Sequence, residues 1–98
     1  MININDIYTA QSYLDSIIVK IKRDNKDYTI TVEMINDDGV LVPMLIDGNH
    51  SLQAAKIDNV IPTIEIVEGV HNCSLVEYVT QFGDLSNPVN IVTGFDLW

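Results

Sequence analysis

Positive charge is scarce in this sequence. The chain has only five Lys and Arg residues against fourteen Asp and Glu residues, a formal net charge of −9 at pH 7. Binding to nucleic acid needs clustered Lys and Arg that neutralise phosphates, and attraction to an anionic membrane surface needs the same residues. The composition therefore predicts no direct nucleic-acid binding and no membrane binding.

Cysteine and long apolar runs are also scarce. The single cysteine, Cys73, cannot form an internal disulfide, so the chain gains nothing from an oxidising compartment. Uninterrupted apolar runs such as Ile17-Ile18-Val19 are short, whereas a bilayer-spanning helix needs roughly 20 residues. We find no basic start followed by an apolar run, the pattern of a secretory signal. Together these features predict a cytoplasmic protein.

Apolar residues are plentiful enough for one core. The chain has 98 residues, of which 47% are hydrophobic, and this fraction argues against disorder. A chain of this length buries roughly two-thirds of the surface that its unfolded form exposes. Without internal repeats or a Pro- or Ser-rich linker, the sequence predicts a single domain over residues 1–98.

The charges are unevenly distributed along the chain. Residues 1–26 contain three acids and four bases, whereas residues 27–98 contain eleven acids and the single base Lys56. The corresponding net charges are +1 and −10. We therefore expect an acidic surface that is formed by the later part of the chain.

The first expected element is a helix over residues 7–21. Its apolar residues follow spacings of three and four, which places them on one helical face. They are Ile7, Ala10, Leu14, Ile17 and Ile21. The alternative is a strand over residues 17–21, which are mostly β-branched, with a turn at Asp24. The upstream extent of the apolar face favours the helix.

Four strands are expected further along the chain. Alternation with a period of two predicts strands over residues 28–34 and 61–67. The almost wholly apolar residues 40–46 are typical of a strand that is covered on both faces, in which Pro43 needs a bulge or a sheet edge. Residues 89–93 complete the set. Mixed with helices, these strands predict a small mixed-sheet α/β domain with about four strands.

Two further helices bring the expected number to three. Residues 51–57 form a short helix that ends at a turn. Residues 75–82 form the next one, with Ser74 as its cap and Glu77 three residues later to complete a capping box. Gly83 is expected to end this helix as a C-terminal glycine.

A motif lies between the strand over residues 40–46 and the helix that follows it. Its parts are Leu45-Ile46-Asp47-Gly48, Gly48-Asn49-His50-Ser51, Ala54-Ala55 and Ile61-Pro62. In spacing and order it resembles the ParB/sulfiredoxin superfamily, which carries Leu-Ile-Asp-Gly, Gly-x-His-Arg and Ala-Ala before a strand near Ile-Pro. The resemblance is clearest over residues 10–68 and implies a ParB/sulfiredoxin-like fold, with residues 69–98 as an unassigned extension.

The resemblance implies a corner that cradles the phosphate of a nucleotide. A glycine there lets the backbone approach a ligand, and the free N–H groups of a helix start attract an anion. If the nucleotide site is retained, the implied ligand-binding residues are Asp47, Gly48, Asn49, His50, Ser51 and Lys56. The alternative for His50 is structural, with its ring bound to a strand carbonyl so that it holds the corner.

Two departures from the family pattern predict a degenerate site. Ser51 stands in place of the arginine that grips the phosphate, and a serine cannot balance phosphate charge. Asn49 stands in place of the cysteine that sulfiredoxin-type members carry before the histidine. A zinc site from His71 and Cys73 would be short of ligands. We therefore expect no catalytic residue, no cofactor and no metal ligand.

The leading hypothesis is a non-enzymatic regulatory or inhibitor protein that binds a basic, normally nucleic-acid-binding protein. An acidic surface of this kind acts as a DNA mimic, because opposite electrostatic fields speed encounter and fix orientation. Its small size and acidity are typical of inhibitors encoded by phages or mobile elements. The expected partner-binding residues are Glu33, Asp37, Asp38, Asp58, Glu65, Glu68 and Trp98. Trp98 belongs to a tail that either packs back on the sheet or presents an anchor to a partner.

Two alternatives belong to other functional classes. The first is a nucleotide-binding domain with residual phosphoryl or nuclease-type activity, in which Ser51 and Lys56 replace the lost arginine. The second is a homodimer in which the positive segment of one copy meets the negative segment of the other.

Overall fold

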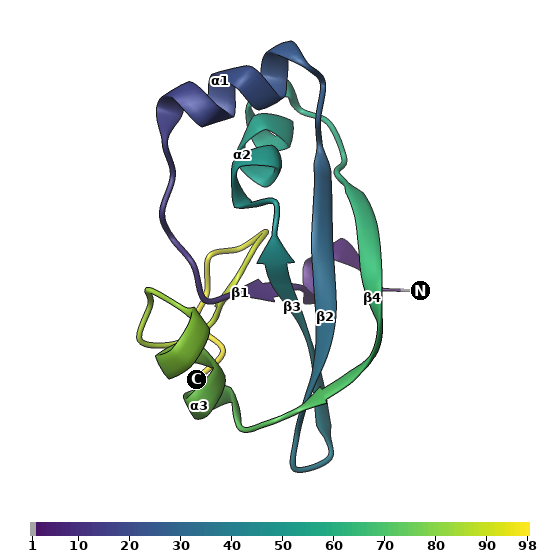
Figure 1. The fold of residues 1–98 in the computed structure, drawn as a ribbon, viewed down its shortest axis with the longest axis vertical. Coiled ribbons are helices and arrows are strands. Elements are labelled where there is room, and N and C mark those ends of the chain that lie inside the picture. Colours follow the sequence, from purple (N-terminus) through teal and green to yellow (C-terminus); the bar gives the residue numbers. More distant parts are fainter. Residues whose placement is uncertain (1) are drawn as a thin grey trace.

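The computed structural model describes residues 2–98, and its core is a mixed β-sheet flanked by helices (Figure 1). In chain order the elements are the 3₁₀ turn η1 (Ile4–Asp6), β1 (Tyr8–Thr9), α1 (Ser16–Asp24), β2 (Thr29–Asp37), β3 (Val40–Asp47), α2 (Asn49–Asp58), β4 (Thr63–Asn72), α3 (Leu75–Phe82) and β5 (Val89–Asn90). The expected α/β class and three helices are confirmed, and the sheet has five strands instead of about four.

The sheet has the strand order β4-β2-β3-β1-β5. β2 and β3 form an antiparallel hairpin, and the turn residues Asp38 and Gly39 both have positive φ, at 50° and 90°. Positive φ at both turn positions matches the right-handed twist of the flanking strands. β4 returns parallel to β2 after the crossover through α2, and it forms one margin of the sheet (Figure 1).

Two hydrophobic clusters cover opposite faces of this sheet. Met44 and Leu45 are neighbours in β3 and both are buried, but they belong to different clusters. Successive side chains of a strand point to opposite faces, so the clusters lie on opposite faces too. α3 covers the Met44 face through residues such as Tyr78, and this cluster is called the α3-side cluster below. α2 covers the Leu45 face through Leu52, together with Ile7, and this cluster is called the α2-side cluster.

The expected helix over residues 7–21 is wrong in its first half, and so is the alternative strand over residues 17–21. α1 begins only at Ser16, where the Asp15 side chain caps it by accepting the N–H groups of Ile17 and Ile18. Ile17 is 69% exposed, whereas Val19 on another face of the helix is buried.

The residues upstream of α1 are buried for a different reason. Ile7 and Ala10 flank β1, which pairs with β3 and β5, and each lies in one of the two clusters. Strand pairing with distant segments therefore overrode the local helical spacing. The spacing of three and four was present, but it did not reflect one helical face.

Smaller differences concern strand lengths and irregularities. β4 extends to Asn72 instead of ending at residue 67, and β5 has only two residues. The register of β2 and β3 shifts between the pairs Thr31–Asp47 and Val32–Leu45, so β3 has its irregularity at Ile46 and not at Pro43.

None of the helices within residues 2–98 is long and apolar enough to cross a membrane.

Gly83 ends α3 as expected, but not through a left-handed conformation. Its φ is −101°, in the extended region. A Cβ at this position would lie 2.6 Å from the carbonyl oxygen of Ala10 and 2.7 Å from the Ala10 Cβ. The glycine is therefore required by close packing against the segment after β1, and it fixes how near α3 lies to that segment.

Candidate functional site

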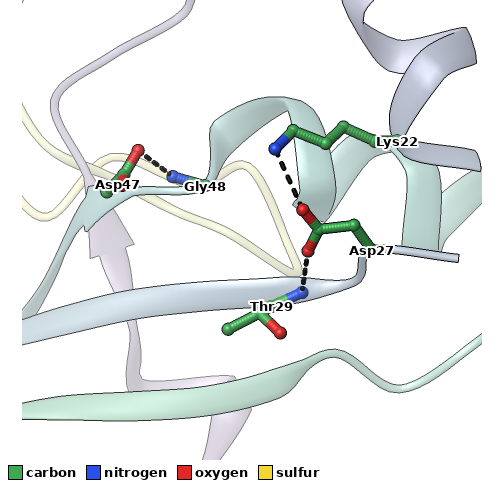
Figure 2. Close-up of polar contacts among 5 residues, drawn as sticks. All are labelled: Lys22, Asp27, Thr29, Asp47 and Gly48. Atoms are coloured by element: carbon green, nitrogen blue, oxygen red, sulfur yellow. Dashed lines mark hydrogen bonds and ion pairs between the residues drawn. The ribbon is translucent and has the colours of Figure 1, made fainter. Parts of the chain in front are cut away.

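The corner between β3 and α2 is built on Gly48. This residue has φ 98°, and a Cβ on it would lie 2.7 Å from the Thr29 carbonyl oxygen and 2.9 Å from the Ile30 Cα. Only glycine fits such a close approach to β2. The Gly48 N–H donates to the Asp47 carboxylate at 2.8 Å (Figure 2). The tight turn that the motif predicts is therefore present in the backbone.

A cavity of about 380 Å³ opens at this corner. Of the six residues that the resemblance implies, four line it: Asp47, Gly48, Asn49 and His50. Ser51 is buried, with 1% of its surface exposed, and does not line the cavity. Lys56 lies on the solvent side of α2 and lines other cavities. The residue at the position of the family arginine therefore does not face the space where a phosphate would bind.

The cavity has one cation, which the sequence did not point to. Lys22 of α1 lines it, and its Nζ lies 3.0 Å from the Asp27 carboxylate (Figure 2). Asp27 also accepts the Thr29 N–H at 3.3 Å. Hydrogen bonds from Lys22 first and from Thr29 second hold the pKa of Asp27 below its usual 3.8. Lys22 is therefore already paired with a carboxylate and offers little to a second anion.

The remaining polar atoms of the corner hold the segment that precedes α1. His50 Nε2 accepts the Asp15 backbone N–H at 3.1 Å, and the Asn49 amide donates to the Tyr13 carbonyl at 3.0 Å. The His50 ring also meets the Tyr13 ring edge-on, with centroids 5.8 Å apart. His50 therefore anchors a backbone N–H, where the structural alternative expected a strand carbonyl, and this bond occupies its Nε2.

Asp84 also lines the cavity. Its carboxylate accepts the Ser12 N–H and hydroxyl, both at 2.8 Å, and the Tyr13 N–H at 3.2 Å. The hydroxyl of Ser12 first, then its N–H, and then Tyr13 hold the pKa of Asp84 below its usual 3.8. Together with Asp47, it brings two acidic residues to the lining of the cavity. Their charge opposes the binding of a phosphate.

Asp84→Asn is expected to lower the melting temperature at pH 7, because the amide replaces one of the two accepting oxygens. A carboxyl whose pKa is lower in the folded than in the unfolded state stabilises the protein above the unfolded value, and this stabilisation is lost as the pH falls through the folded value. Thermal unfolding followed by circular dichroism at pH 7 and pH 3 measures the effect. The difference in melting temperature between the variant and wild type should be smaller at pH 3 than at pH 7. An equal difference at both pH values would contradict the stabilising role of the ionised Asp84 carboxylate.

Three of the acids expected to bind a partner are engaged inside the protein. Asp58 binds Arg23 and the Tyr28 hydroxyl, each at 2.8 Å, and the Tyr28 bond first and Arg23 second lower the pKa of Asp58. Glu33 lies 2.9 Å from His71 Nδ1. The Asp37 carboxylate accepts the N–H of the first residue of α3 at 3.2 Å. These acids position secondary structure, and their oxygens are only partly available to a partner.

The other three acids of that set are exposed. Asp38 lies at the tip of the β2–β3 hairpin, and Glu65 and Glu68 lie on β4. Within residues 2–98, none of the three side chains forms a hydrogen bond or an ion pair. Asp38, Glu65 and Glu68 are called the free acids below.

All the cations lie at one end of the protein. Lys20, Lys22 and Arg23 belong to α1, Lys26 follows it, and Lys56 belongs to α2. The hairpin, β4 and α3 contain no Lys or Arg. Figure 1 shows α1 and α2 at one end of the long axis and the hairpin turn at the other. The hairpin, β4 and α3, with the free acids, are called the acidic region below.

The tail packs back on the protein in part, and its two aromatic side chains stay exposed. The Leu97 N–H donates to the Pro88 carbonyl at 2.9 Å, and the Leu97 side chain packs against the α3-side cluster. The Phe95 and Trp98 side chains stay 75% and 55% exposed. The backbone is therefore fixed, while Trp98 presents an aromatic surface to solvent.

Cys73 and the histidines form no metal-binding group. Within residues 2–98, no three His, Cys, Asp or Glu side chains are placed to hold a metal ion. Burial first, and then the carboxylates of Glu77, Asp37 and Glu33, raise the pKa of the Cys73 thiol above its usual 9.0. A raised pKa disfavours the thiolate, which is the nucleophilic form.

Comparisons of the chain with protein families, with curated proteins and with solved structures found no match. The resemblance to the ParB/sulfiredoxin superfamily therefore rests on the motif around Gly48 and the order of elements near it. Function has to be inferred from the charges, contacts and exposed surfaces of this chain.

Proposed function

We propose that this protein is a non-enzymatic regulator that binds a basic, normally nucleic-acid-binding protein through its acidic region. The observation that supports this function is the separation of charge: all five Lys and Arg residues lie on or next to α1 and α2, and the acidic region has none. A surface with one sign of charge attracts a surface of the opposite sign, speeds encounter and selects orientation. The partner's nucleic-acid-binding surface has the required positive charge.

The pairing of the cations strengthens this proposal. Three of them are bound to acids of the same chain: Lys20 to Asp24 at 2.7 Å, Lys22 to Asp27 at 3.0 Å and Arg23 to Asp58 at 2.8 Å. The positive end is therefore largely neutralised, which leaves little charge to attract the acidic region of a second copy. A heterologous basic partner fits the charge distribution better than the homodimer does.

The proposal includes a place in the ParB/sulfiredoxin-like superfamily, as a member whose nucleotide site is degenerate. Gly48 supports this by its close approach to β2. Ser51 supports the degeneracy, since it is buried where the family carries a phosphate-binding arginine.

A charge-neutralised variant tests the acidic region. Asp38→Asn with Glu68→Gln is expected to weaken binding to the partner about fivefold, since each exposed charge contributes up to about 1 kcal/mol. The matched control is Asp24→Asn with Asp27→Asn, which removes the same charge near the positive end and should keep the wild-type affinity. The partner is captured from lysate at low salt and identified by mass spectrometry, and affinities are then measured with the purified partner.

The captured protein should be basic, should be released by salt of about 500 mM and should be displaced by duplex DNA. The proposal fails if no basic protein is retained, or if the two double variants bind the purified partner equally well.

The nucleotide-binding alternative is favoured by one observation, the cavity of about 380 Å³ at the start of α2. Against it stand the two carboxylates of Asp47 and Asp84 in that cavity and the pairing of Lys22 with Asp27. Heat on calorimetric titration with millimolar ATP or CTP and Mg²⁺ would favour this alternative over the non-enzymatic regulator.

A further inference from the structure

The outer edge of β4 is a free strand edge. β4 stands first in the strand order and pairs with β2 alone, and its ten residues exceed the roughly five or six of an average strand. Figure 1 shows it along the margin of the sheet. Unpaired N–H and C=O groups on such an edge are a template for another strand.

The hydrogen bonds to β2 identify the backbone groups that point outward. The Thr63 N–H donates to the Tyr28 carbonyl at 3.1 Å, at one end of β4. The Cys73 N–H donates to the Asn36 carbonyl at 3.2 Å, just beyond the other end. The direction of the backbone groups alternates along a strand. The outward N–H groups are therefore those of Ile64, Ile66, Val70 and Asn72.

A bulge divides this edge into two runs. Ile66 pairs with Val32 and Val70 pairs with Met34, so β4 has three residues, 67–69, where β2 has one. Gly69 within the bulge has φ 89° and open space around it. A flexible extended segment can follow both runs, whereas a second copy of rigid β4 would have to match its own bulge to this one.

The side chains of β4 define the chemistry of the incoming strand. β4 carries neither Lys nor Pro, the residues that commonly protect an edge from pairing. Ile66 and Val70 are 48% and 49% exposed and share a sheet face, while Glu65 lies on the opposite face. A partner strand that alternates apolar and basic side chains would pack on Ile66 and Val70 and meet the charge of Glu65.

We propose that the β4 edge takes up an extended segment of the partner, with alternating basic and apolar residues, as a sixth strand. This inference rests on the proposed function and adds the mode of recognition. A second copy of the chain fits poorly, because antiparallel self-pairing would bring Glu65 and Glu68 of both copies together, and like charges on neighbouring strands destabilise the pair.

The probe is a synthetic eight-residue peptide of alternating lysine and valine, and its control is the same peptide with every backbone amide nitrogen methylated. Both carry the same charge, but the control cannot donate the backbone hydrogen bonds of a sheet. The first peptide should bind about tenfold more tightly than the second.

Ile66→Pro should weaken binding of the first peptide about tenfold, since it removes an outward N–H that β2 does not use. The matched variant Ile66→Ala loses the side-chain contact but keeps that N–H, so it should weaken binding clearly less than Ile66→Pro does.

Amide hydrogen exchange on the wild-type protein gives a readout that needs no variant. Binding of the first peptide should slow exchange at Ile64, Ile66, Val70 and Asn72, and the N-methylated peptide should not. Equal affinity of the two peptides, or unchanged exchange at these amides, overturns the edge proposal. The acidic-region function fails separately, when the Asp38→Asn, Glu68→Gln variant binds the captured basic protein as tightly as its control does.

Discussion

Replacing Gly48 by alanine is expected to lower the free energy of unfolding by about 3 kcal/mol. The new Cβ would lie 2.7 Å from the Thr29 carbonyl oxygen and 2.9 Å from the Ile30 Cα, both backbone atoms of β2. β2 is paired with strands on both sides, so it cannot move away cheaply. The residue would also hold a φ of 98°, which side chains with a Cβ rarely adopt. Urea unfolding followed by circular dichroism measures the change.

Gly39→Ala is the matched control for this prediction. Gly39 has a similar φ of 90°, but a Cβ there would meet no atom within 4 Å. The control therefore isolates the cost of the left-handed backbone, about 1 kcal/mol. The excess loss in Gly48→Ala reports the contact with β2. Equal losses in the two variants would show that the corner does not need the close approach.

The second large effect is expected from Leu45→Ala, which should lower the free energy of unfolding by about 3 kcal/mol. Leu45 is 1% exposed and lies in the α2-side cluster, where removal of its side chain leaves a cavity. The loss should appear in the same urea experiment as a shift of the midpoint with an unchanged slope.

Leu41→Ala provides the comparison, with the same change in the same strand and on the same face. Leu41 is 55% exposed, so its truncation should cost at most about 0.5 kcal/mol. Similar losses at positions 41 and 45 would contradict the burial of Leu45 in the α2-side cluster.

The elements that the sequence predicted well are those specified by neighbouring residues. β2 shows a period of two, Asp38-Gly39 supplies the two positive φ angles of the hairpin turn, and Ser74 caps α3 through a bond to Glu77 N–H at 3.1 Å. Each of these signals acts over a few residues, so it can be read without knowledge of the rest of the chain.

The start of α1 was missed because it depends on residues far away in sequence. The Asp84 carboxylate holds the Ser12 and Tyr13 backbone in an extended path, and β1 pairs with β3 and β5. One local signal was available, since Asp15 is a good N-cap residue immediately before Ser16. The regular spacing of the apolar residues upstream favoured an earlier start of the helix, but Ile7 and Ala10 pack in the clusters on the sheet.

The candidate site was predicted only where its residues are contiguous. Asp47 to His50 lie together in the cavity because they are neighbours in the chain. Lys22 and Asp84 reach the same cavity from α1 and from the loop after α3. No residue spacing in the sequence predicts that these two side chains lie near Asp47. The same limit applies to the acids, since the pairing of Asp58 with Arg23 and of Glu33 with His71 follows from the tertiary fold alone.

The position of the cations has a consequence for the approach to a partner. With all Lys and Arg at the α1–α2 end of a molecule that measures 41 Å along its longest axis, the protein has a permanent electric dipole along that axis. The field of the basic partner that we propose would exert a torque on this dipole before the surfaces touch. Such a torque would turn the hairpin end towards the partner, so that more encounters begin in a productive orientation.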